Sequence, residues 1–156
     1  DAPPKPLIAG FQTPVTAACL SADERKLYLC SGGLVACATI DLDDAKCSAP
    51  EYLSSLPADA AVVDVAADTA GNLYVCGKDG VLVVDETGDA MLQVELPQPA
   101  TGLCFGGSTN NELVVTAGET VWSIKTNTQG AKPASPEFVN MIDKLAAQGD
   151  YRHVGW

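Results

Sequence analysis

Residues 73–85, LYVCGKDGVLVVD, decide the fold of this chain. Two apolar runs flank a Gly-Lys-Asp-Gly turn, a pattern typical of a β-hairpin. Residues 27–41, LYLCSGGLVACATID, and residues 113–124, LVVTAGETVWSI, repeat the order of strand, glycine-containing turn and strand. The three segments begin 46 and 40 residues apart, and this spacing indicates an internal structural repeat.

Each repeat extends beyond its hairpin. A turn rich in polar residues or glycine and a further short apolar strand precede it, with the strands at residues 17–20, 62–67 and 102–105. We expect looser fourth strands near residues 52–56 and 91–96. Four strands in a repeat of this length are the signature of a β-propeller blade. An ordinary β-sandwich with coincidental turns is the alternative.

The sequence therefore predicts an all-β chain. Residues 10–130 are expected to form a partial β-propeller of about three four-stranded blades, and a short C-terminal helix is expected to follow. Residues 1–9 are rich in proline and are expected to be extended. Residues 131–156 are expected to form a linker, the short helix and an aromatic tail.

The composition excludes some classes of protein. Of the 156 residues 47% are hydrophobic, too many for a disordered chain. The net charge of −11 repels phosphate backbones and anionic lipids, so we expect no nucleic-acid partner. No apolar run approaches the length that spans a bilayer, so no transmembrane segment is expected. Acidity, six cysteines and a start without methionine favour an extracytoplasmic, secreted or organelle-lumenal protein.

The six cysteines form no CxxC pair, and the lone histidine is His153, which argues against a zinc finger. Three cysteines lie in apolar strand-like runs and are expected to be buried free thiols: Cys19, Cys76 and Cys104. The other three lie around the first hairpin and the strand that follows it, and we expect one disulfide among them: Cys30, Cys37 and Cys47. Their spacing leaves the pairing open.

The C-terminal region differs from the repeats. Ser135 and Pro136 predict the start of a helix, and apolar residues follow at helical spacing as far as Leu145. The tail YRHVGW either packs on the blades of its own chain or docks on a partner, because Trp, Tyr and Arg are favoured interface anchors. The docking hypothesis assigns five residues to this surface: Phe138, Ile142, Tyr151, Arg152 and Trp156.

No common catalytic motif competes with this interpretation. The sequence has no GxSxG elbow, no P-loop and no Rossmann glycine pattern. A single histidine near the C-terminus argues against a Ser-His-Asp or Cys-His arrangement. The acidic run DLDD at residues 41–44 is not followed by the glycine and distal glutamate of a calcium loop. We therefore interpret it as a solvated hairpin loop.

Several segments resemble one family. DTAGNLYV at 68–75, GVLVVD at 80–85 and TGLCFGG at 101–107, followed by ELVVTA at 112–117, are similar to segments of the senescence-marker-protein/gluconolactonase/luciferin-regenerating-enzyme family. CLSADERKLY at 19–28 fits an earlier turn of the same family. The family consists of six-bladed propellers. The resemblance covers about residues 10–130, which correspond to the C-terminal three blades only.

The resemblance implies a divalent metal at the centre of the ring, which promotes hydrolysis of lactones or esters. Its ligands are oxygen atoms, a set suited to calcium and related ions. The family's asparagine falls on Thr16, its metal-binding and catalytic aspartate falls on Val63, and its glutamate has no counterpart. Asp64, the neighbour of Val63, and Asp59 are the candidate metal ligands that remain, although a shift of one residue in a strand points a side chain to the other face.

The lost ligand positions favour a non-catalytic interaction subunit, a pseudoenzyme derived from a lactonase-type propeller and without a cofactor. Three blades leave apolar faces uncovered, so we expect protein partners. These are a multi-subunit complex, such as a lumenal photosynthetic or respiratory one, or a second copy that closes the ring. The alternatives are a calcium- or zinc-dependent lactonase or esterase completed by dimerisation, and a small-ligand-binding module.

Overall fold

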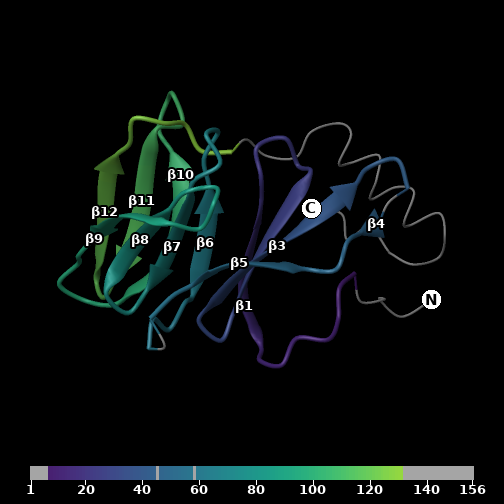
Figure 1. Ribbon diagram of the computed structural model, residues 1–156. Helices are drawn as coiled ribbons and strands as arrows, with labels where there is room; N and C mark the ends of the chain where they lie inside the picture. The colour runs from purple at the N-terminus through teal and green to yellow at the C-terminus, as the bar shows by residue number, and fades with distance from the viewer. Residues whose placement is uncertain (1–6, 45, 58, 132–156) are drawn as a thin grey trace, which may run out of the picture.

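The computed structural model describes residues 7–44, 46–57 and 59–131. These residues form twelve β-strands and no helix. The strands are arranged in three antiparallel sheets that follow one another in chain order, from purple and blue to green in Figure 1. None of the described residues belongs to a helix that is long and apolar enough to cross a membrane.

Each sheet is built from consecutive strands. The first sheet contains β1 (Val15–Leu20), β2 (Lys26–Ser31) and β3 (Leu34–Asp41), with β4 (Lys46–Cys47) and β5 (Glu51–Ser55) both paired to β3. The second sheet contains β6 (Asp64–Ala67), β7 (Leu73–Gly77), β8 (Gly80–Val84) and β9 (Ala90–Val94). The third sheet contains, among the described residues, β10 (Ala100–Gly106), β11 (Glu112–Ala117) and β12 (Thr120–Lys125).

This architecture confirms the all-β, propeller-like fold that the repeats predict. The expected fourth strands are present as β5 and β9, within two residues of their predicted ends. Two details differ from the prediction. The short strand β4 is an addition to the first sheet, and the third sheet has three strands, not four, in the described part of the chain. The predicted C-terminal helix and aromatic tail lie outside the described residues.

The second sheet packs between the other two, which explains why its central strands β7 and β8 are apolar on both faces. Alternate residues of a strand point to opposite faces. Leu73 and Val75 of β7 join the core between the first and second sheets, whereas Tyr74 and Cys76 join the core between the second and third. The ring of Phe105 on β10 meets the ring of Tyr74 edge to face, with 5.0 Å between centroids.

Two apolar cores result, one between each pair of neighbouring sheets. The first includes, besides the residues of β7, Tyr28, Cys30, Val35, Val65, Ala67 and Val84. The second includes Val81, Val83, Ala100, Leu103, Leu113 and Val115. Sheets that stack face to face in this way bury their apolar faces only against their neighbours, as repeats of a propeller do.

A buried carboxylate closes the turn after β6. Asp68 is 1% exposed and accepts hydrogen bonds from five donor groups: the backbone N–H of Ala70 and Asn72, the side-chain amide of Asn72, and the hydroxyls of Tyr74 and Thr128. All five distances lie between 2.7 and 3.2 Å. The bond from Thr128 ties a segment that is distant in sequence to the second sheet.

That segment is the connection that leaves β12. Thr69 donates its backbone N–H to the carbonyl of Gln129, and Ala131 donates to the carbonyl of Ala67. Gly130 pairs with Asp68 in an isolated bridge and lies so close to Phe105 that no side chain would fit there. Residues 128–131 therefore run back onto the second sheet.

Candidate functional site

The inner strands of the three sheets are β1, β6 and β10, with β6 between the other two. The resemblance places a metal at this centre, next to the start of β6. We call this region the Asp64 end of β6, and the turn at Asp68 the Asp68 end. The two ends are separated by the length of the strand, Asp64–Ala67.

Asp64 is half-buried, and both oxygens of its carboxylate accept backbone N–H groups. Oδ1 accepts the N–H of Val65, and Oδ2 accepts the N–H of Leu103 on β10, both at 2.9 Å. Asp64 pairs directly with Cys76 of β7, so both side chains face the third sheet. The predicted candidate ligand therefore links the second sheet to the third.

The two positions that match the family's other ligands also lie at this centre. Val63 precedes β6, donates its N–H to the carbonyl of Cys76 at 3.0 Å, and has a side chain that is 44% exposed and carries no ligand atom. Thr16 lies in β1, and its hydroxyl donates to the carbonyl of Cys30 at 3.4 Å. The position that corresponds to the family's carboxylate is thus reachable from solvent but apolar.

Asp59, the other candidate ligand, forms an ion pair with Lys78 on the turn between β7 and β8. The hydrogen bond from Lys78 lowers the pKa of Asp59, and the same contact raises the pKa of Lys78. Lys78 also donates its backbone N–H to the carbonyl of Ala60 at 2.9 Å. The structure therefore directs Asp59 toward Lys78 and not toward Asp64.

Three thiols lie close enough to Asp64 for their pKa values to respond to its charge. Burial, followed by Cys30 and Asp64, raises the pKa of Cys19 to about 12. Burial and Asp64 raise the pKa of Cys30 and of Cys76 to about 11. Neutral thiols are weak metal ligands and weak nucleophiles. In the described ranges, no group of three or more His, Cys, Asp or Glu side chains is arranged to hold a metal ion.

All six cysteines are free thiols in the structure, so the disulfide expected among Cys30, Cys37 and Cys47 is not formed. Cys30 and Cys37 face the core between the first two sheets, whereas Cys47 packs with Ile40 in a separate cluster. Cys104 was expected to be buried but is exposed. It lies on the face of β10 that points away from the second sheet, because its neighbour Leu103 occupies the core.

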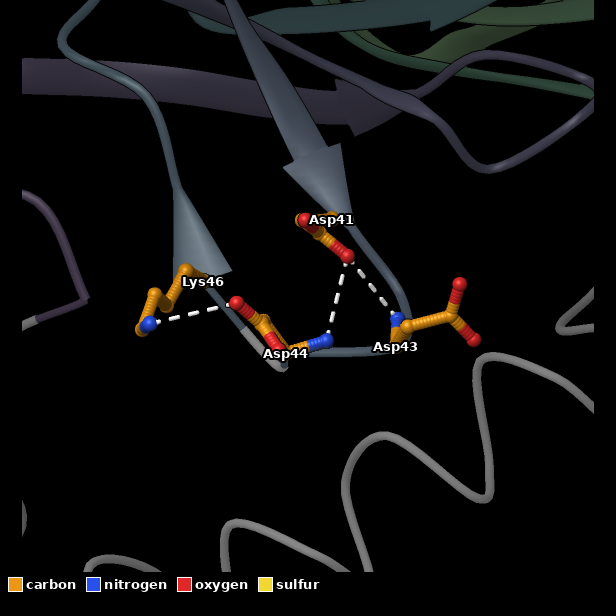
Figure 2. Close-up of polar contacts among 4 residues, drawn as sticks. All are labelled: Asp41, Asp43, Asp44 and Lys46. Atoms are coloured by element: carbon orange, nitrogen blue, oxygen red, sulfur yellow. Dashed lines mark hydrogen bonds and ion pairs between the residues drawn. The ribbon is translucent and has the colours of Figure 1, made fainter.

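The acidic run after β3 forms a hairpin loop, as predicted. Figure 2 shows that one carboxylate oxygen of Asp41 accepts the backbone N–H groups of Asp43 and Asp44, both at 3.0 Å. These bonds, with that of Asp44 first, lower the pKa of Asp41. Lys46 forms an ion pair with Asp44 at 3.3 Å. The carboxylate of Asp41 is thus bound to the backbone of the loop, and that of Asp44 is paired with Lys46.

The five residues of the docking hypothesis lie outside the described residues: Phe138, Ile142, Tyr151, Arg152 and Trp156. Two features of the described part are not among those predicted from the sequence. One is the open edge of β12, and the other is an apolar groove between β9 and β12. The signal for both was present in the repeats, since only the first and second units have an identifiable fourth strand.

Comparison with known proteins is consistent with this arrangement. The profile of the family described as SMP-30/Gluconolactonase/LRE-like region matches residues 7–119. A gluconolactonase from Xanthomonas campestris is 21% identical over 76% of this chain and 39% of its own, with a TM-score of 0.66. Luciferin-regenerating enzyme is 22% identical over 66% of this chain and 37% of its own, with a TM-score of 0.59.

A third solved structure is regucalcin from Agrobacterium tumefaciens, a calcium-binding protein. It is 14% identical over 79% of this chain and 48% of its own, with a TM-score of 0.64. At these identities the likeness establishes the fold alone. The chain spans between 37% and 48% of the length of these three structures. No curated protein gives a significant match.

Proposed function

Because the chain belongs to the SMP-30/gluconolactonase/LRE-like family, we propose that it is a lactonase-type propeller module that binds a protein partner and does not catalyse hydrolysis. The observation that carries the proposal is the side chain at position 63. The family resemblance places a metal-binding and catalytic aspartate there, and this chain has Val63. A valine can neither hold a cation nor move a proton.

The use of Asp64 supports the same proposal. Each carboxylate oxygen of Asp64 accepts one backbone N–H, and a rotation of this carboxylate toward a cation would release the N–H of Leu103, a residue that is 9% exposed. An unpaired buried donor costs about 1–3 kcal/mol, which metal binding would have to offset. A thiol of Cys19, Cys30 or Cys76 that replaced the missing carboxylate would first have to lose its proton, which their raised pKa values make costly.

The proposed partner is a larger protein complex, and the proposed setting is extracytoplasmic. Support for a partner comes from the third sheet, which ends at β12 in the described part of the chain and exposes Val121 and Trp122 by 67% and 36%. These two residues point to opposite faces of β12, so apolar side chains are exposed on both sides of an edge strand, and an exposed edge strand is a site where another chain can pair. The acidity of the chain suits a partner surface that is neutral or basic.

The test is a metal and hydrolysis measurement on the full chain. We expect neither calcium nor zinc to bind in a stoichiometric amount, and gluconolactone to be hydrolysed no faster than in buffer with the same ion. The matched variants are Val63→Asp, which restores a carboxylate, and Val62→Asp, which places one at the neighbouring buried position. Stoichiometric metal together with turnover by the unmodified chain would overturn the proposal.

A second candidate is a metal-dependent lactonase or esterase that two copies complete. It is favoured by membership of a family in which solved structures carry the names gluconolactonase and calcium-binding regucalcin. In that case hydrolysis per chain would rise with protein concentration as copies associate. A rate per chain that stays at the buffer level across the concentration series excludes it.

A further inference from the structure

The third sheet has an open edge. The first and second sheets continue from their third strand to β5 and β9, but β12 has no further partner strand among the described residues. Thr126 donates its N–H to the carbonyl of Asn111, so these two residues form a hydrogen-bonded pair. Along β11 and β12, non-hydrogen-bonded and hydrogen-bonded pairs alternate from there. The backbone N–H and C=O groups of Val121, Ser123 and Lys125 therefore point away from β11.

An apolar groove of about 470 Å³ lies beside this edge. Leu92 and Val94 of β9 and Leu113 and Ile124 of the third sheet supply its apolar lining, and Asn72 and residues 125–128 add polar side chains. Leu92 pairs with the core residue Val83 and so faces the third sheet, yet it is 58% exposed. Figure 1 shows β9 and β12 at the same side of the molecule, and residues of both strands line this groove.

The corresponding place between the first and second sheets is filled. There β5 is the fourth strand, and its residue Leu53 packs against the core between the two sheets. The carbonyl of Leu53 lies so close to Gly88, between β8 and β9, that no side chain would fit at that glycine. The groove beside β12 is thus the space that a fourth strand would occupy in the third sheet.

We propose that β12 binds an extended segment of a partner protein, which adds to the third sheet as its fourth strand and places alternate apolar side chains in the groove. The proposal rests on the proposed function, because it names the surface and the chemistry of the partner. Main-chain hydrogen bonds to an exposed edge supply affinity in this mode of binding, and the pockets for alternate side chains supply specificity.

The groove and the charge of the chain define the partner segment. It carries aliphatic residues such as Val, Ile or Leu at every second position, to pack on Leu92, Val94 and Ile124. It has no proline where β12 needs a donor. Its other residues are neutral or basic, because the chain carries a net charge of −11.

Neither residues 128–131 nor a second β12 fits this space as well. Residues 128–131 run onto the second sheet, away from the edge. The β12 of a second copy could present Trp122 and Ile124 to the groove. The second sheet of that copy would then lie on the same side of the joined third sheets as the second sheet of this chain. Turned over, it would place Ser123 and a second Lys125 in a groove that the chain's own Lys125 already lines, and like charges at such a distance repel.

The experiment uses the full chain and a synthetic peptide, acetyl-Lys-Thr-Val-Thr-Val-Thr-Val-Lys-amide, with residue-resolved amide hydrogen exchange as the readout. We expect saturable binding and an exchange rate at Val121, Ser123 and Lys125 that falls at least about tenfold. The amides of Trp122 and Ile124 already bond to β11 and should change less. This alternation distinguishes strand addition from non-specific contact.

Two variants remove the site in different ways. Ser123→Pro deletes one outward N–H, a change that an edge strand tolerates, and Ser123→Thr is the matched control that keeps it. Leu92→Glu places a charge in the groove at a side chain that is exposed in the unbound chain. We expect Ser123→Pro and Leu92→Glu to weaken peptide binding at least about tenfold, with unchanged thermal unfolding. Ser123→Thr should bind as the unmodified chain does.

The proposal is overturned if the peptide does not bind or binds Ser123→Pro with full affinity. It is also overturned if the amides of Val121, Ser123 and Lys125 are already protected without peptide, because another part of the chain or a second copy then covers the edge. A measured mass twice that of the 16.1 kDa chain identifies the second copy. Lactone hydrolysis is a separate readout: turnover refutes the proposed function, whereas failed peptide binding alone refutes only this inference.

Discussion

The two ends of β6 each carry an aspartate, but the two carboxylates lie in different surroundings. Asp68, after the strand, is 1% exposed and accepts hydrogen bonds from five donor groups, two of them hydroxyls. Asp64, the first residue of the strand, is half-buried and accepts two backbone N–H groups. The Asp68 end holds the connection after β12 in place, and the Asp64 end holds β10.

The difference shows how this chain uses its inner acids. A carboxylate that serves as a metal ligand directs a lone pair at the cation. The carboxylates of Asp64 and Asp68 accept hydrogen bonds that join segments of the fold, and the exposed position next to Asp64 carries Val63. In the described part of the chain, both carboxylates therefore hold neighbouring segments of the fold together.

Asp68→Ala should have the largest effect on stability. It leaves five donors around a buried position without their acceptor, so we expect the free energy of unfolding to fall by about 3–4 kcal/mol. The matched control is Asp85→Ala. Asp85 closes a similar turn, where its Oδ1 accepts two N–H groups and the hydroxyl of Thr87, but this turn is accessible to solvent. Denaturant unfolding measures both.

The comparison fails if Asp68→Ala costs no more than Asp85→Ala. In that case solvent satisfies the donors at the Asp68 end, and the connection after β12 is held by packing alone. Amide exchange at Thr69 and Ala131 distinguishes the two cases, because their N–H groups bond across this contact, to the carbonyls of Gln129 and Ala67, and release of the connection from the second sheet would expose them.

The fold could be predicted from the sequence because its signals are local. The turn residues before Leu73 and the apolar runs around Gly80 lie within one hairpin, and they recur. The partners of Asp64 and Asp68 could not be predicted in the same way. Leu103 is 39 residues from Asp64, and Thr128 is 60 residues from Asp68, so both contacts depend on how whole sheets pack.

The cysteines illustrate the same limit. Cys104 lies in an apolar run, yet it is exposed because its face of β10 has no neighbouring sheet in the described part of the chain. Cys30 and Cys47 are close in sequence but belong to different apolar clusters. Period-two patterns identify which residues share a face, but only the packing of sheets decides which faces are covered.

Asp64→Ala should have an intermediate effect. It removes the acceptor of the buried N–H of Leu103, and we expect the free energy of unfolding to fall by about 1–2 kcal/mol. Asp64→Asn is the matched control, because its amide oxygen can still accept this N–H. The amide resonance of Leu103 reports the bond directly. A loss as large as that of Asp68→Ala would show that the two ends of β6 are equally rigid.

The smallest effect concerns alkaline pH and the thiols at the Asp64 end. The pKa of Cys19 is about 12 in the folded chain and 9.0 when the thiol is unperturbed. A folded pKa above the unfolded value means that the contribution to stability is complete below pH 9 and is lost as the pH rises toward 12. Between pH 8 and pH 10 this loss amounts to about 1 kcal/mol for one thiol.

Denaturant unfolding at pH 8 and pH 10 isolates this contribution. Cys19→Ala should lose less stability over this interval than the unmodified chain, by about 1 kcal/mol. Cys104→Ala, at an exposed thiol, should lose as much as the unmodified chain. If Cys19→Ala and Cys104→Ala respond alike, Cys19 is hydrated in the folded chain. The Asp64 end would then be open to water and to cations, and the contrast between the two ends of β6 would be one of access as well as of hydrogen bonding.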